Sequence, residues 1–223
     1  MIIQIYTIQS KTEALELVNL GVDNIGLTPA SIGLPGEISP DLAKDIFENV
    51  KAKHNIALSV SNKISEIVEM CLFVKPDVLH LCGEPGNLSD EEINLIRTKI
   101  SSEIPNIKIM QAVSVDNWDA VDVAIKYSKL ADFLILDTST KDVEGIGASG
   151  AIHDWNISKT IVDSVSIPVI LAGGLSPDNV SDAIARVKPW GVDSLTHTNK
   201  YNIDGSFVKD LGKVNQFITN SLR

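Results

Sequence analysis

The chain alternates short apolar runs with amphipathic stretches, and it does so eight times along its 223 residues. The seventh apolar run, over residues 168–172, is short and apolar on both faces, which is typical of a strand buried in a parallel sheet. Each amphipathic stretch carries apolar residues at helical spacing. Strands that alternate with helices predict right-handed β–α–β crossovers.

This alternation predicts a single (β/α)8 TIM barrel of class α/β, because eight such units fit in a chain of this length and the fold usually needs about 250 residues. We expect one domain over residues 1–223. An open doubly wound sheet is the alternative, although the first loop lacks the glycine pattern for a dinucleotide.

The predicted strands cover residues 2–8, 24–27, 56–60, 77–82, 107–113, 132–137, 168–172 and 191–195. The predicted helices cover residues 11–20, 63–74, 116–129, 157–165, 178–187 and 207–222, with two more that begin at Pro40 and after Ser89.

The composition restricts the partners of the protein. Hydrophobic residues make up 44% of the chain and the net charge is −10, which argues against nucleic acid or an anionic membrane surface as a partner. No run approaches the roughly 18–20 apolar residues of a membrane span, and the first residues do not resemble a secretory signal. Cys71 and Cys82 have no metal-site or redox spacing. We therefore expect a cytoplasmic protein with reduced thiols.

The seventh apolar run ends in two adjacent glycines, Gly173 and Gly174. Ser176 is the expected N-cap of the following helix and Pro177 its first residue. Glycines let backbone N–H groups approach a ligand, and a helix N-terminus favours an anion. Phosphate is commonly bound after strands 7 and 8 of a TIM barrel, so we predict a phosphate site here. An ordinary strand-to-helix turn is the alternative.

Two further loops are expected at the same end of the barrel. Thr196 and His197 follow the eighth run and offer a hydroxyl and an imidazole to phosphate oxygens. A long loop after the sixth run contains Gly147, Ser149 and Gly150 and is predicted to cover the substrate. A hydrophilic surface loop and plain flexibility are the respective alternatives.

Candidates for proton transfer lie at the ends of strands. Asp137 ends an apolar run, where partial loss of hydration raises its pKa and suits a general acid; capping of the next loop is the alternative. Period-two alternation puts His80 and Cys82 on one face of their strand, pointing into the barrel, and likewise Gln4 and Tyr6. A buried structural histidine is the alternative for His80.

With these residues the chain resembles the phosphoribosylanthranilate isomerase family, TIM-barrel enzymes of tryptophan biosynthesis. The resemblance implies an aldose-to-ketose (Amadori) isomerisation of an N-linked phosphoribosyl substrate. It implies a small phosphorylated sugar as partner and no cofactor or metal, since acid, base and a shielded pocket suffice. A monomer and a homodimer both remain open. The similarity is weaker elsewhere and strongest in residues 136–138, 147–150, 154–155, 172–180 and 191–193.

The resemblance also implies roles for individual residues. The acid of the family falls on Asp137, but its base, a cysteine on strand 1, falls on Tyr6. A phenol with a pKa near 10 is a poor base at neutral pH. His80 or Cys82 could replace it, Tyr6 could act with a neighbour's help, or the reaction could differ.

Two other positions depart from the family pattern. A substrate-binding arginine of the family falls on Gly36, and a glycine after strand 8 is replaced by His197. Phosphate can still bind through His197 and the threonine hydroxyls. The alternatives to the family reaction are a diverged paralogue acting on another phosphosugar or a nucleoside-derived compound, and a non-catalytic barrel that binds a phosphate ligand.

Overall fold

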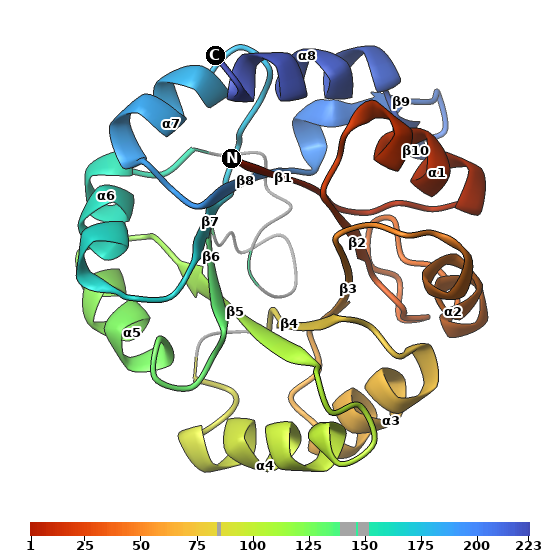
Figure 1. Cartoon of the computed structure of the whole chain (residues 1–223), viewed down its shortest axis with the longest axis vertical. Helices are drawn as coiled ribbons and strands as arrows, with labels where there is room; N and C mark the ends of the chain where they lie inside the picture. The colour runs from red at the N-terminus through yellow and green to blue at the C-terminus, as the bar shows by residue number, and fades with distance from the viewer. Residues whose placement is uncertain (84–85, 139–145, 147–151) are drawn as a thin grey trace.

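The computed structural model describes residues 1–83, 86–138, 146 and 152–223. Its centre is a closed barrel of eight parallel strands, in which the last strand pairs with the first. Figure 1 shows these strands as a ring enclosed by a ring of helices. Closure rules out the open sheet and confirms the predicted TIM barrel. The strands are β1 (Ile2–Ile5), β2 (Asn24–Leu27), β3 (His54–Ser59), β4 (Val78–Leu81), β5 (Lys108–Ser114), β6 (Phe133–Asp137), β7 (Val169–Leu171) and β8 (Gly191–Ser194).

A helix follows each strand and packs on the outside of the barrel (Figure 1). Ser10, Ser39 and Ser89 are the N-caps of α1, α2 and α4, because a hydroxyl satisfies a free N–H group of the first turn. Ser89 and Glu92 form a capping box at the start of α4. The helices are α1 (Lys11–Leu20), α2 (Pro40–Asn49), α3 (Ile64–Val74), α4 (Asp90–Ser101), α5 (Ala120–Tyr127), α6 (Trp155–Ser164), α7 (Val180–Val187) and α8 (Leu211–Ser221).

Two apolar layers hold the barrel together. The larger lies between strands and helices and contains Leu79 and Leu81, whereas the inner one contains Tyr6 and Cys82. Successive side chains of a strand point to opposite faces, so β4 supplies both layers. The predicted inward direction of Cys82 is thereby confirmed.

The predicted helix over 207–222 is wrong in its first turn. Residues Phe207–Lys209 form the strand β10, which pairs antiparallel with β9 (Asn199–Tyr201), and α8 begins only at Leu211. Glu13 accepts the backbone N–H of Lys209 at 2.5 Å and so holds this segment extended against α1. A contact between residues so far apart in sequence overrides the local helical pattern.

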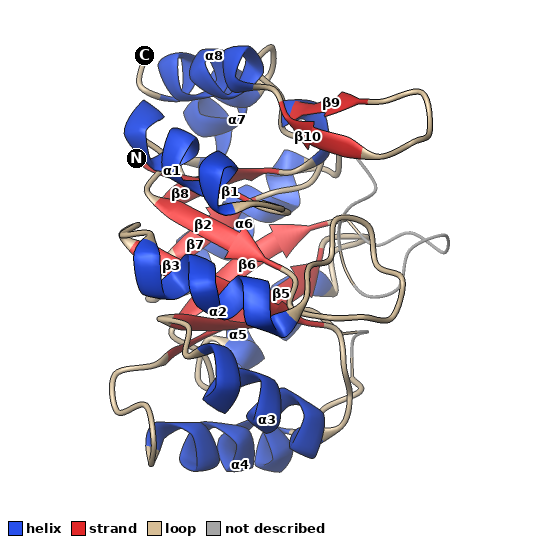
Figure 2. Cartoon of the chain, turned by 90° about the vertical axis from the view of Figure 1, so that its right-hand side faces the viewer, coloured by secondary structure: helices blue, strands red, loops and turns tan. Residues whose placement is uncertain are grey.

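Figure 2 shows the β9–β10 hairpin on the side of the barrel toward which the strands point. A short 3-10 helix, η1 (Thr196–Thr198), connects β8 to this hairpin. In the described part of the chain, no helix has the length and apolar character needed to cross a membrane.

Candidate active site

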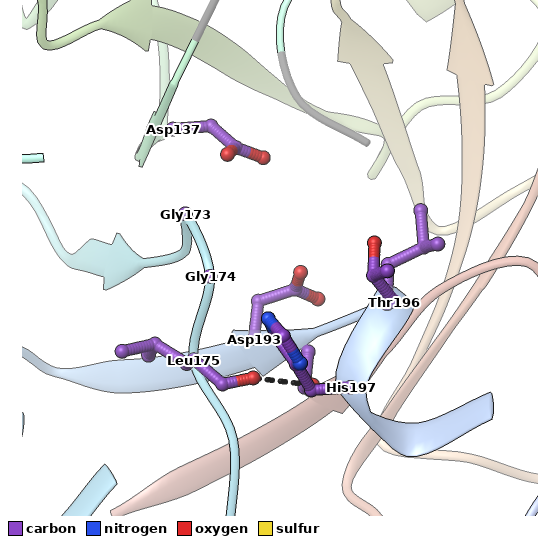
Figure 3. Close-up of a pocket in the computed structure, with 9 residues that line it drawn as sticks. Asp137, Gly173, Gly174, Leu175, Asp193, Thr196 and His197 are labelled. Atoms are coloured by element: carbon purple, nitrogen blue, oxygen red, sulfur yellow. Dashed lines mark hydrogen bonds between the residues drawn. The ribbon is translucent and has the colours of Figure 1, made fainter. Parts of the chain in front are cut away.

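A cavity lies at the carboxyl ends of β6, β7 and β8, and its volume is about 260 Å³ when the part open to solvent is included. Figure 3 shows it between the turn after β7 and the η1 segment. It unites the predicted residues Gly173, Gly174, Thr196 and His197 with Asp137. The complete lining is Asp137, Gly173, Gly174, Leu175, Asp193, Ser194, Leu195, Thr196 and His197.

The glycine pair is required by the shape of its turn. Gly173 and Gly174 have φ of 76° and 63°, a left-handed conformation that other residues rarely adopt. A Cβ atom on Gly173 would lie 2.7 Å from Nδ1 of His153 and 2.9 Å from Oγ1 of Thr138. The backbone therefore lines the cavity without a side chain in the way.

The helix after this turn begins later than predicted. The helix α7 starts at Val180, with Asn179 at its N-cap position, but Asn179 makes no side-chain cap bond. Ser176 caps the turn before it, since its hydroxyl accepts the N–H of Asp178 at 3.2 Å and its carbonyl accepts the N–H of Val180 at 3.1 Å. The side chain of Asn179 accepts the N–H of Ser176 at 2.8 Å and donates to the carbonyl of Gly174 at 3.0 Å. These bonds close a separate turn ahead of the helix, as asparagine side chains often do.

Asp137 lies at the end of β6, and its carboxylate points into the cavity (Figure 3). Burial raises the pKa of Asp137 to about 7, although the N–H of Thr138 donates to the carboxylate at 2.7 Å and opposes the rise. A carboxyl group with a pKa near neutrality can hold a proton and release it. This environment has the properties expected of a general acid.

Asp193 on β8 is a second carboxyl group in the same cavity, and the sequence analysis gave it no role. Its side chain is only 4% exposed, and Oδ1 has no hydrogen-bond partner among the described residues. Burial and the charge of Asp137 raise the pKa of Asp193 well above its usual range. One clue was present in the sequence: an acidic residue on the inward face of a strand that otherwise reads as apolar.

Tyr6 and His80 meet inside the barrel. The phenol oxygen lies 2.6 Å from Nδ1 of His80, and both residues are 3% exposed. Burial and the charges of Asp193, Cys82 and Asp137 raise the pKa of Tyr6 well above 10, while burial lowers the pKa of His80 to about 3. Both groups are therefore neutral near pH 7, and one of them donates to the other in this hydrogen bond. The ring of Tyr6 also covers Gly26, and a Cβ atom on Gly26 would lie 2.3 Å from Cδ1 of Tyr6.

Cys82 follows β4, and it forms hydrogen bonds with the backbone of Ile146. Its Sγ donates to the carbonyl oxygen of Ile146 at 2.9 Å, and burial raises its pKa to about 12. Tyr6, His80 and Cys82 thus gather in the barrel interior, but none of them is among the residues that line the cavity of Asp137.

Gly36, on which the resemblance places an arginine of the family, is closely packed in this structure. A Cβ atom on Gly36 would lie 2.8 Å from Cζ of Phe207, and the carbonyl of Phe207 accepts a hydrogen bond from the side chain of Gln9. The hairpin therefore occupies the space beside Gly36, and a larger side chain there would have to displace Phe207.

The remaining predicted site residues, Gly147, Ser149 and Gly150, lie outside the described residues. Ile146 is described, and its N–H donates to the carbonyl of Cys82 at 3.2 Å. Among the residues that the structure describes, no group of three or more His, Cys, Asp or Glu side chains is arranged to hold a metal ion.

A closed eight-stranded barrel with a cavity after β7 and β8 defines a TIM-barrel protein whose cavity lies at the carboxyl ends of the strands. The model of the N-(5'-phosphoribosyl)anthranilate (PRA) isomerase family matches residues 3–220. The chain therefore belongs to the PRA isomerase family.

Individual relatives agree with this assignment. An N-(5'-phosphoribosyl)anthranilate isomerase of Methanothrix thermoacetophila is 30% identical over 174 residues, which cover 78% of this chain and 77% of the relative. That of Methanocella arvoryzae is 32% identical over 154 residues, 69% of this chain and 65% of the relative, so this match spans just under two thirds of that protein. The crystal structure of the Thermotoga maritima phosphoribosyl anthranilate isomerase has a TM-score of 0.78 at 26% identity, covering 100% of this chain and 99% of that one.

Proposed function

We propose that the protein catalyses the isomerisation of N-(5'-phosphoribosyl)anthranilate, an aldose-to-ketose Amadori rearrangement. Membership of the PRA isomerase family supports this proposal at the level of the whole chain. The observation that carries it is the cavity in which Asp137, with a pKa of about 7, faces the glycine turn. We further propose that the protein acts in the cytoplasm.

The phosphate group of the substrate binds at the end of the cavity formed by Gly173, Gly174, Thr196 and His197. Backbone N–H groups of the glycine turn and the side chains of Thr196 and His197 are suitable donors. Because this end of the cavity is built from β7 and β8, the bound phosphate places the ribose toward Asp137 on β6.

Asp137 is the general acid in this proposal. It gives its proton to the ring oxygen of the ribose, so that the C1–O bond breaks while the nitrogen lone pair forms a C=N bond. A general base then removes the proton from C2. Tyr6, His80 and Cys82 remain the bases predicted from the sequence, and each would need to lose or accept a proton against the effect of its burial.

The proposed activity is tested with freshly formed PRA and the purified protein, and the ketose product is separated by chromatography. We expect turnover in the wild type, and a loss of roughly 10²–10⁴-fold in kcat for Asp137→Asn, the usual contribution of an acid. In a strain that lacks the isomerase, the wild-type gene should restore growth without tryptophan, and the gene for Asp137→Asn should not. A folded wild-type protein that leaves PRA unchanged would contradict the proposal.

A further inference from the structure

Two carboxyl groups face the same cavity from strands on either side of β7. Asp137 extends from β6 and Asp193 from β8, and Figure 3 shows both carboxylates directed into the space between the glycine turn and Thr196. Asp193 is almost fully buried, and its Oδ1 atom has no hydrogen-bond partner within the described ranges. A buried, unpartnered carboxylate oxygen is costly in a folded protein and indicates a group kept for a ligand or a reaction.

No neighbouring cation forms an ion pair with Asp193 in the described part of the chain. The nearby ammonium of Lys209 instead donates to the carbonyl of Leu195 at 3.1 Å and to Oδ1 of Asn199 at 2.6 Å. Gln4 on β1 is the register partner of Asp193, and its Nε2 atom makes no hydrogen bond of good geometry within the described chain. The Gln4 side chain and the charge of Lys209 nevertheless oppose part of the rise in the pKa of Asp193. The remaining groups that face Asp193 are Asp137, Tyr6 and Cys82, with His197 in the same cavity lining.

We propose that Asp193 is the catalytic base that removes the C2 proton in this chain, in place of the cysteine that Tyr6 replaces. This inference rests on the proposed isomerisation. Its basis is position, because Asp193 and Asp137 line one cavity together with the phosphate-binding residues, whereas Tyr6, His80 and Cys82 do not line it.

The proton transfers balance over the full reaction. Asp137 protonates the ring oxygen as the C1–O bond breaks and the C=N bond forms. Asp193 takes the C2 proton, and the C–H electrons form a C1=C2 double bond while the C=N pair returns to nitrogen. The C2 hydroxyl then gives its proton to Asp137, and Asp193 returns its proton to C1. The ketose is released with both carboxyl groups in their starting states, and no oxidant or reductant is consumed.

The coupling between the two carboxyl groups supports this division of work. The negative charge of Asp137 raises the pKa of Asp193 further above its usual range. When Asp137 has given up its proton to the ring oxygen, its new charge therefore makes Asp193 a stronger proton acceptor. Two carboxyl groups in one buried site resist ionising together, so a single negative charge on the pair allows one member to act as acid and the other as base.

The test compares Asp193→Asn with the wild type on PRA. Asparagine keeps the size of the side chain but cannot accept a proton, so we expect kcat to fall roughly 10²–10⁴-fold with little change in KM. With substrate deuterated at C2, the isotope effect on kcat should increase in Asp193→Asn, because proton removal becomes rate-limiting. Formate should partly restore activity to Asp193→Ala, which a purely structural role would not allow.

A matched variant controls for the loss of a carboxylate. Asp23→Asn, an equally conservative loss of a carboxylate outside the cavity, should keep kcat within about tenfold of the wild type. Asp23 accepts the N–H of Ile3 at the opposite end of the barrel. Circular dichroism checks that Asp193→Asn is folded. An increase in its thermal stability on addition of inorganic phosphate, equal to that of the wild type, checks that its anion site is intact.

The outcomes distinguish this inference from the proposed function. A wild type without PRA turnover overturns both. An active wild type with Asp193→Asn within tenfold of it, or with an unchanged isotope effect, overturns only the role of Asp193. If Asp193→Asn does not fold, Asp193→Glu decides: a shifted carboxyl group should lower kcat at least about tenfold, and an unchanged kcat overturns the inference.

Discussion

Burial sets the chemistry of individual residues inside this barrel. Charged forms lose their hydration in an apolar interior, so burial raises the pKa of carboxyl and thiol groups and lowers that of histidine. Cys71 and Cys82 are both buried and free, and burial raises the pKa of each to about 12. Cys82 was predicted as a possible base, but in the folded protein it is a thiol that donates to Ile146.

Thiol labelling at pH 8 should report this state directly. The thiolate is the reactive form, and a pKa of about 12 keeps almost all of each cysteine protonated at that pH. We expect the native protein to react with a disulfide reagent far more slowly than the urea-unfolded protein, in which both thiols react at once. Cys71→Ser isolates the response of Cys82. Rapid labelling of that variant in native buffer would show that Cys82 is accessible and ionised.

At the scale of elements, the helices depend on their first turns. Ser89 accepts the N–H of Glu92 at 3.2 Å, while the carboxylate of Glu92 accepts the N–H of Ser89 at 2.8 Å. Ile93, Ile96 and Ile100 form the buried face of the same helix. Both features are local in sequence, and for this reason α4 could be predicted with its correct N-cap.

Replacing Ser89 with alanine should lower the free energy of unfolding by about 1 kcal/mol, the usual contribution of a serine cap. The loss arises because the N–H of Glu92 loses its acceptor at the helix start. Urea denaturation measures it, with Ser65→Ala as control, since Ser65 is exposed on α3 and should change the stability by less than about 0.5 kcal/mol. Equal stability of the two variants would show that water replaces the cap without cost.

At the scale of the whole molecule, barrel closure places carboxyl groups where folding is opposed by their charge. The pKa of Asp137 is about 7 in the folded protein, against an ordinary value of 3.8. Between these values the folded state binds more protons than the unfolded state, so this group lowers stability as pH rises. Asp193 acts in the same direction, whereas His80, with its lowered pKa, acts in the opposite one.

Asp137→Asn should therefore become more stable relative to the wild type as pH rises from about 4 to 7, with no further gain above pH 7. A single proton gives a slope of at most about 1.4 kcal/mol per pH unit. Urea denaturation at several pH values measures the difference, and Ser65→Ala, which removes no titratable group, should show no such trend. A pH-independent difference for Asp137→Asn would mean that its carboxyl group is not desolvated by folding.

The site was predictable wherever a residue's neighbours in sequence determine its position. The glycine pair, Asp137 and the inward direction of Cys82 follow from where apolar runs end and from period-two alternation. The hydrogen bond between Tyr6 and His80 was not predictable, because their strands face each other across the barrel and 74 residues separate them. Asp193 was overlooked because a single acidic residue in an apolar strand shows its importance only beside Asp137.

The sequence by itself determined the alternation of strands and helices, the start of α4 after Ser89, and the end of the barrel at which the cavity lies, since these depend on local periodicity and on the common direction of parallel strands. Only the tertiary structure decided that the sheet closes between β1 and β8, that residues 207–209 join a hairpin, and that two carboxyl groups share one cavity. These features depend on contacts between segments far apart in the sequence, and the free energy of such contacts cannot be deduced from a local pattern of residues.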